Sequence, residues 1–257
     1  MNLLKNTTVL AALMLLVSAN AYATHPLITD DTGTQGKGKY QIEINSRFSR
    51  DSENGIETRS KEASSTLSCG ITDNIDLIAG LPLEWRTLSS TKEQGIGDMG
   101  VDVKWRLLRS EVHNLSVALK PGFSIPTGNA EKGFGHGEPC TKAMLIATHK
   151  GRLGALHCNI GYTRNAYKLD SDKETLRQNI WNGSLAAEIN VLTNIKTVAD
   201  IGIETNQDKA SDSHPAFLLG GVIYSVSENL DLDLGLKEGL NKSATDRSLL
   251  VGMSARF

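Results

Sequence analysis

The chain has 257 residues, is close to neutral with 27 Lys and Arg against 29 Asp and Glu, and contains three cysteines. Such a balance lacks the basic excess of nucleic-acid-binding domains, so we expect no nucleic-acid partner. An odd number of cysteines does not indicate a disulfide framework. No segment after the amino-terminal region is apolar over about 18 positions, which excludes a helical membrane protein. It does not exclude a β-barrel, because alternating faces average to the hydropathy of a soluble protein.

The first residues have the three parts of an export signal. Lys5 lies in a short polar start, an apolar run covers 9–17, and Ala21-Tyr22-Ala23 has the small-x-small pattern that signal peptidase cuts. The apolar run is too short to cross a bilayer core of about 30 Å as a helix. We therefore expect residues 1–23 to be a signal peptide that is cleaved after Sec-type export, and residues 24–257 to form a single domain.

From residue 40 onward, apolar and polar residues alternate in short runs. In the clearest run, Leu232 and Leu234 share one face while Asp231 and Asp233 share the other. This period of two is typical of strands that have one face toward lipid and one toward a polar lumen. The runs are 40–48, 64–71, 75–86, 98–107, 115–124, 141–149, 156–162, 181–191, 195–204, 217–226, 230–237 and 249–257. We expect an all-β, transmembrane, antiparallel up-and-down barrel of about twelve strands.

The connections between the runs alternate in length. The tight turns have polar, turn-forming residues, as in Thr72-Asp73-Asn74. The other tight turns lie at 110–113, 150–152, 192–194 and 227–229, and the long polar stretches at 51–60, 87–97, 126–139, 164–177, 205–214 and 238–246. Outer-membrane barrels have short periplasmic turns and long extracellular loops, so the long stretches are expected to face outward from the cell.

A soluble β-sandwich or lipocalin-like barrel also alternates and also uses short turns. It would turn its apolar face inward. The number of strands and the charges on nearly every polar face count against it. So does the last run, from Leu249 to Phe257, because an alternating strand with a terminal aromatic residue resembles the assembly signal of bacterial outer-membrane barrels.

The polar faces would give the lumen a mixed charge. The residues predicted to line it are Glu43, Arg47, Glu84, Arg86, Asp102, Lys104, Arg106, Lys120, His157, Glu188, Asp200, Asp231, Asp233 and Lys237. Two outcomes stay open: rings of charge that set an ion preference, or opposite charges that pair across the barrel and plug it. A barrel of about twelve strands is narrower than a porin of 16–18, so we expect passage of single small solutes.

The sequence gives little support for a catalytic site or a metal site. His157 is the only histidine placed on the wall's lumen face, and a barrel lipase would need a serine in reach of it, for which there is no local motif. Four other histidines lie without the paired spacing of zinc sites. They are His113, His136, His149 and His214. We expect no enzyme activity and no cofactor or metal.

The Gly133-x-Gly135-x-Gly137 run resembles a nucleotide loop only superficially, because no helix follows it. We interpret it as a flexible loop that folds over or into the pore. Cys69 and Cys158 are interpreted as small lipid-facing residues. If the hairpin around Gly151 pairs, Cys140 lies too far out of register to bond with Cys158.

The segment 121–129, followed by 132–137, resembles the "LPTG…G.G.G" stretch of the outer-membrane transporter family named for the meta-pathway of phenol degradation. Further similarity lies in Gly95-Ile96-Gly97-Asp98 leading into Lys104-Trp105-Arg106, in 26–34 and in 230–257. The resemblance covers most of the chain after residue 23. It implies a barrel transporter for aromatic or other small hydrophobic compounds.

We therefore expect a channel of the Gram-negative outer membrane for passive passage of small, aromatic or hydrophobic molecules. Its expected partners are outer-membrane lipid, the barrel-assembly machinery and the solute itself. The alternatives are a non-conducting structural or adhesive barrel with partner-binding loops, or a barrel lipase. The sequence leaves the substrate, the state of the lumen and the oligomeric state open.

Overall fold

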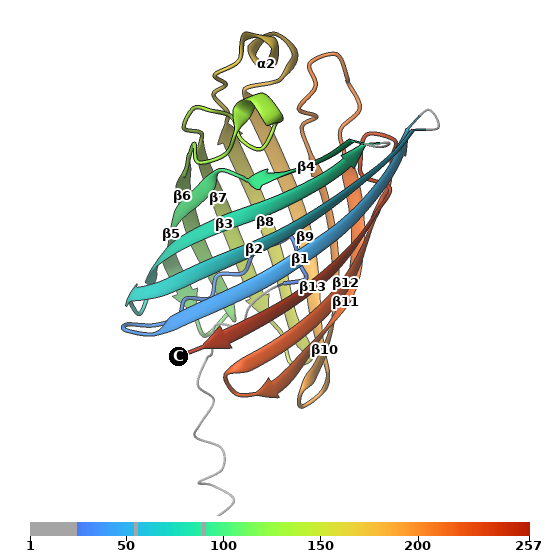
Figure 1. The fold of residues 1–257 in the computed structure, drawn as a ribbon. Coiled ribbons are helices and arrows are strands. Elements are labelled where there is room, and N and C mark those ends of the chain that lie inside the picture. Colours follow the sequence, from blue (N-terminus) through green and yellow to red (C-terminus); the bar gives the residue numbers. More distant parts are fainter. Residues whose placement is uncertain (1–24, 54–55, 89–90) are drawn as a thin grey trace, which may run out of the picture.

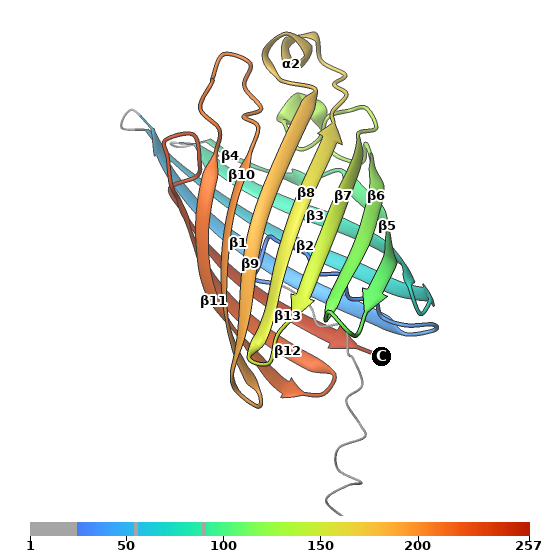
Figure 2. The ribbon, with the colours of Figure 1, turned by 180° about the vertical axis from the view of Figure 1, so that it is seen from behind.

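The chain folds into one β-sheet that closes on itself (Figure 1 and Figure 2). The structure, a computed structural model, describes residues 25–53, 56–88 and 91–257. The predicted signal peptide, 1–23, lies outside these residues. The strands are β1 (Tyr40–Glu53), β2 (Ile56–Thr72), β3 (Ile75–Leu88), β4 (Thr91–Ile96), β5 (Met99–Ser110), β6 (Leu115–Ile125), β7 (Thr141–Lys150), β8 (Gly154–Arg164), β9 (Asn179–Leu192), β10 (Ile195–Glu204), β11 (Ala216–Ser227), β12 (Leu230–Gly239) and β13 (Arg247–Arg256). Two short helices are η1 (Ala130–Lys132) and α2 (Asp170–Thr175).

The wall is an antiparallel barrel with twelve positions. β1 pairs with β13 and closes the sheet, with Gln41 opposite Arg256 and Arg50 opposite Arg247. β4 and β5 share one position, because both pair with β3, β4 along its carboxy-terminal half and β5 along its amino-terminal half. The fold class predicted from alternation is therefore confirmed.

The apolar side chains of the barrel wall face outward. Leu232 and Leu234 on β12 are 42% and 54% exposed, whereas Asp231 and Asp233, which alternate with them, are buried. Asp233 contacts His25 inside the barrel, so the leucines on the other face of β12 lie on the outer surface, where a membrane barrel meets lipid. The soluble alternative, which turns its apolar face inward, is excluded by this orientation.

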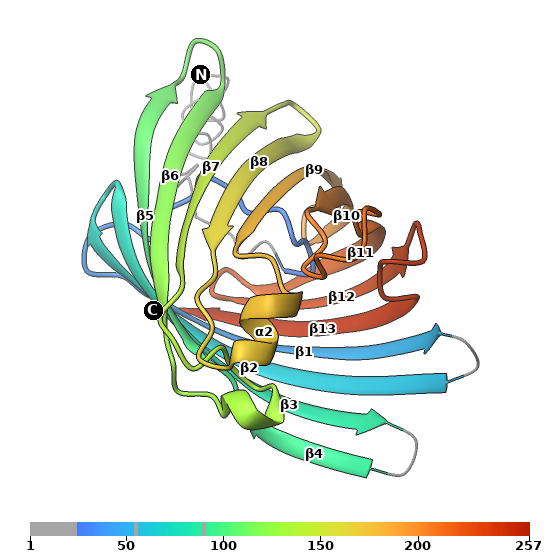
Figure 3. The ribbon, with the colours of Figure 1, turned by 90° about the horizontal axis from the view of Figure 1, so that it is seen from above.

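Turns and loops are sorted to opposite ends of the barrel. The short turns lie at one end and the long loops at the other, where α2 and η1 also lie (Figure 1 and Figure 3). Within the described residues, no helix is both long and apolar enough to cross a membrane.

The prediction of loops at 51–60 and 87–97 is wrong in large part. β1 and β2 continue to a tip at Glu53 and Ile56, and β4 occupies 91–96. These strand ends carry polar residues on both faces, as in Thr91-Lys92-Glu93-Gln94. The ladder of hydrogen bonds continues there, but the alternation that reveals a strand disappears once both faces meet water.

Candidate functional site

The polar face of the wall points into the barrel, and its charged residues lie at different depths. Asp102, Lys104, His157, Glu188, Asp200, Asp231 and Asp233 are buried. Glu43, Glu84, Arg106, Lys120 and Lys237 are partly buried, and Arg47 and Arg86 are exposed. That these side chains line a path for solute stays a prediction.

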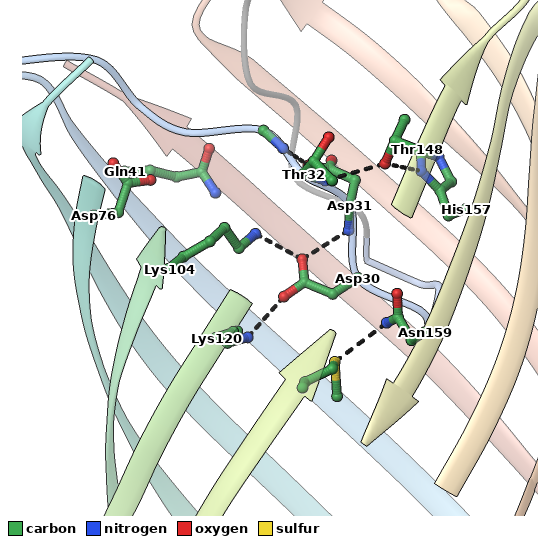
Figure 4. A network of polar contacts seen from close by, with 12 residues as sticks. Asp30, Asp31, Thr32, Gln41, Asp76, Lys104, Lys120, Thr148, His157 and Asn159 are labelled. Carbon is green, nitrogen blue, oxygen red and sulfur yellow. Dashed lines mark hydrogen bonds and ion pairs between the residues drawn. The ribbon is translucent and has the colours of Figure 1, made fainter. Parts of the chain in front are cut away.

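The segment before β1 crosses the inside of the barrel. We call residues 25–37 the strap. In Figure 4 it runs inside the wall, with Asp30 directed to Lys104 and Lys120 and Thr32 directed to Thr148. The strap contacts β12 at one end through His25 and Asp233, and the β2–β3 turn at the other end, where Lys37 N donates to Asp73 Oδ1 at 3.1 Å. It therefore links wall positions that are far apart in the sheet.

Asp30 is the central charge of the strap. Its two carboxylate oxygens lie 2.7 Å from Lys104 Nζ on β5 and 2.7 Å from Lys120 Nζ on β6 (Figure 4). Burial alone would raise the pKa of Asp30, but the two lysines outweigh it and hold that pKa well below its usual range. Two of the predicted lumen cations thus bind one carboxylate that the prediction did not include.

Wall carboxylates, in turn, bind the backbone of the strap. Asp200 on β10 accepts hydrogen bonds from Ile28 N at 2.7 Å, Thr29 N at 2.8 Å and Thr29 Oγ1 at 2.6 Å. Asp76 on β3 accepts from Gln35 N at 2.9 Å. An ionised carboxylate offers only acceptors, so it satisfies amide donors that the strap, having no strand partner, leaves free.

His157 belongs to a third contact with the strap. Thr148 Oγ1 accepts from Thr32 N at 3.1 Å and lies 3.0 Å from His157 Nδ1, while His157 Nε2 faces Glu188 Oε1 at 3.4 Å. The order hydroxyl, imidazole, carboxylate is that of a catalytic triad. Thr148 is only 1% exposed, however, and its oxygen already binds the strap. The arrangement docks the strap, with the Thr148 hydroxyl engaged at the edge of a cavity that His157 and Glu188 also line.

The strap separates two cavities in the barrel. One, of about 750 Å³, lies toward the short turns and is lined by residues such as Arg106, Lys196 and Glu188. The other, of about 410 Å³, lies against β1–β3 and β5–β7 and includes Glu43 and Asp102. Both volumes fall within the range of small-molecule sites, roughly 300–1,000 Å³.

One part of the inner face is apolar. Leu27 of the strap packs against Ala186, Val198, Leu219, Ile223 and Leu250, with Phe217 beside them. These wall residues come from β9, β10, β11 and β13. The inner wall therefore has an apolar strip on one side, which Leu27 of the strap covers, and charged side chains on the other.

Three long loops lie at the opposite end of the barrel (Figure 3), and we call residues 126–140, 164–178 and 205–215 the loop cap. Phe134 is buried within it, and a Cβ at Gly95 would lie only 2.6 Å from its ring. Asp98 binds the same loop, accepting from Gly128 N at 2.9 Å and His136 N at 2.8 Å. The Gly-rich loop thus folds inward as expected, but it is tied down.

Arg177 joins the second and third loops of the cap. Its guanidinium donates to the carbonyl oxygens of Asn206 at 2.9 Å, Ser211 at 3.0 Å and Lys209 at 3.1 Å, and also to Asp208. A planar fork with five donors suits this set of acceptors. Lys168 N donates to the carbonyl oxygen of His136 at 2.9 Å and joins the second loop to the first, so the cap is a connected unit.

Cys140 and His136 form a polar pair in the cap. Burial raises the pKa of the Cys140 thiol, yet the hydrogen bonds from His136 and from Ala166 N lower it further than burial raises it. The same contact with Cys140, helped by Asp98, raises the pKa of His136 against the effect of burial. All three cysteines are unpaired, and Cys158 is exposed on the outer wall. Among the described residues, no group of three or more His, Cys, Asp and Glu is placed to hold a metal ion.

These features define a class: a closed outer-membrane β-barrel with a lipid-facing belt and a strapped, polar lumen. The chain belongs to the family described as "Putative MetA-pathway of phenol degradation", whose model matches residues 23–257. A comparison with curated protein sequences gave no match.

Solved structures share the fold. A crystal structure of an outer-membrane channel from Pseudomonas putida F1 has a TM-score of 0.72 at 14% identity, over 88% of this chain and 98% of that one. The NanC porin has a TM-score of 0.59 at 9% identity, over 83% and 98%. The KdgM porin has a TM-score of 0.53 at 10% identity, over 84% and 99%. At such identities the likeness shows the fold alone.

Proposed function

We propose that this chain is a channel of the Gram-negative outer membrane for passive passage of single small molecules. The observation that carries the proposal is the interior: two cavities flank a strap instead of a packed core. The predicted lumen charges, from Glu43 on β1 to Lys237 on β12, would line the path. The fold neighbours include one structure described as a channel and two described as porins, which agrees with this function.

The solute that fits this interior best has an apolar body. The strip formed by Val198, Leu219, Ile223 and Phe217, which Leu27 of the strap covers, would offer such a body a surface that excludes water once the strap shifts. The charged residues opposite offer hydrogen bonds to a polar end. Small aromatic or other hydrophobic compounds match this pair of surfaces, which is also what the family's description suggests.

Passage requires the strap to shift or a solute to move around it, because Asp31 and Gly33 of the strap line both cavities. Planar-bilayer recordings of the purified protein test this directly. We expect small conductance steps for the wild type and larger or longer openings for Asp200→Ala, which removes the acceptor for Ile28 and Thr29. Asp246→Ala, an exposed carboxylate outside the strap and the loop cap, is the control and should resemble the wild type. Silence of both the wild type and Asp200→Ala would overturn the channel.

The loop cap favours a second candidate, an adhesive barrel that binds a partner through its loops. Arg177 and Phe134 give the cap a fixed shape, and a fixed shape suits recognition. A silent barrel that binds a partner only while the cap is intact would support this function instead.

A further inference from the structure

A row of cationic side chains crosses the outside of the barrel at its loop end. Arg50 on β1 lies opposite Arg247 on β13 and opposite Arg59 on β2. The same register continues through Thr87 on β3 to Lys92 on β4. Side chains directly opposite each other on one face of a sheet are about 5 Å apart at Cβ. Three guanidinium groups therefore stand side by side across three strands.

The row faces outward at the edge of the apolar belt. The next register toward the turns contains Leu249, Phe48, Lys61 and Trp85. The three apolar members are exposed, and Lys61 Nζ lies 5.9 Å from the centroid of the Phe48 ring. Aromatic residues on the outer face of a barrel mark the depth at which lipid headgroups begin. The cationic row lies just beyond that depth, on the slanting β1–β2 and β3–β4 hairpins (Figure 1).

The charge of this row is only partly balanced by protein carboxylates. Glu57 forms ion pairs with both Arg50, at 2.7 Å, and Arg59. Glu238 forms an ion pair with Arg247 at 2.7 Å. Like charges directly opposite each other destabilise a sheet, so the arrangement calls for further anions.

The row is also a local feature. The Lys and Arg side chains that face outward from the described strands are Arg50, Arg59, Lys61, Lys92, Arg164 and Arg247. All except Arg164 belong to the row or to the register beside it. The wall between β5 and β11 therefore has no comparable concentration of charge at the same end.

We propose that this row binds the headgroup phosphates of an anionic lipid in the outer leaflet. Arginine forks bind phosphate oxygens in pairs, and clustered Lys and Arg beside a membrane-spanning element attract anionic headgroups. The apolar register below, with Phe48 and Trp85, would receive the acyl chains. The inference rests on the outer-membrane location in the proposed function, but not on conduction, because the wall separates the row from the lumen.

Native mass spectrometry of the full-length barrel in detergent tests the proposal with bisphosphorylated lipid A as the probe. The test variant is Arg50→Gln/Arg59→Gln/Arg247→Gln. The matched control is Arg47→Gln/Arg86→Gln/Lys237→Gln, which removes the same number of cations from the inner face. We expect at least a tenfold loss of lipid affinity in the test variant and less than a twofold change in the control. Wild-type protein should bind lipid A without phosphates as weakly as the test variant binds the intact lipid.

Equal binding by the test variant and the wild type would overturn the proposal, and so would equal binding of dephosphorylated lipid. Full competition by inorganic phosphate at the lipid's own concentration would also overturn it, since the acyl chains would then contribute nothing. Heat-modifiable migration on a gel checks that every variant is folded. Bilayer conductance keeps the two proposals apart: the test variant should conduct as the wild type does, and a silent barrel that still binds lipid A would refute only the channel.

Discussion

The strap and the loop cap obstruct the same lumen by different chemistry. The strap is held by ionised groups, with Asp30 between Lys104 and Lys120, and Asp200 under three donors. The cap is held mostly by hydrogen bonds to backbone atoms and by packing, with Arg177 on backbone carbonyls and Phe134 buried. The strap lies inside the barrel, where the inner wall supplies charged side chains as partners. The loops lie beyond the end of the wall, where the partners are mostly backbone atoms of the neighbouring loops. Charge pairs should therefore control the strap, and shape should control the cap.

The largest effect on this comparison is expected from Asp30→Ala. The substitution leaves two enclosed lysines without their carboxylate, and breaking a buried pair from one side costs about 3 kcal/mol. Hydrogen exchange at strap amides, including Thr29, should become faster, and conductance should rise. Asp246→Ala removes an exposed carboxylate and should do neither. Unchanged protection of the strap amides would show that its charges do not hold it.

Arg177→Lys should act on the other region with a smaller effect. A lysine cannot present a planar fork to several carbonyl oxygens, so the cap should lose about 1 kcal/mol of local stability. Hydrogen exchange should accelerate at 205–214 and stay constant in the strap. If the strap also loosened, the two regions would be one cooperative unit and the comparison would fail.

Acidity should separate the regions further. His136 has a raised pKa in the folded cap, so it stabilises the cap below the ordinary histidine value of about 6.5, and this contribution is lost as pH rises through the raised value. Asp30 has a lowered pKa, so its contribution persists until pH falls far below the usual carboxylate range. Between pH 8 and pH 5.5 the cap should tighten while the part of the strap around Asp30 stays unchanged. Exchange rates corrected for intrinsic pH dependence measure this, and His136→Gln should abolish it. The groups that face His136 are Asp98, Cys140 and the Tyr167 ring.

The wall could be predicted from the sequence because one physical constraint acts on every strand. Lipid outside and polar groups inside impose alternation, so Leu232 and Asp233 reveal their faces without any knowledge of partners. Alternation no longer reveals a strand where the wall leaves the lipid. At 51–53, 56–60 and 91–96 both faces of the sheet meet water, and strands that are well paired have no alternating pattern.

The strap could not be predicted in the same way, because its partners are distant in sequence. Asp30 meets Lys104 and Lys120 only after the barrel closes, and Thr29 meets Asp200 across it. The sequence does contain an indication. Thr29-Asp30-Asp31-Thr32-Gly33-Thr34 is dense in hydrogen-bonding groups, precedes the first alternating run and has no period of its own. A polar segment that precedes a barrel with many charged lumen residues is therefore a candidate to fold into that lumen and bind them.

The smallest effect is expected from His157→Gln. The substitution keeps a hydrogen-bonding side chain beside Thr148 and Glu188, so the strap should remain docked, with exchange at Thr32 altered by less than a factor of about five, or about 1 kcal/mol. Neither the wild type nor the variant should release fatty acid from phospholipid micelles, because the strap covers the Thr148 hydroxyl. If the wild type hydrolysed phospholipid and His157→Gln did not, the contact between His157 and Thr148 would be catalytic. It would also require the strap to leave Thr148 during turnover, and protection at Thr32 would then decrease when substrate is added.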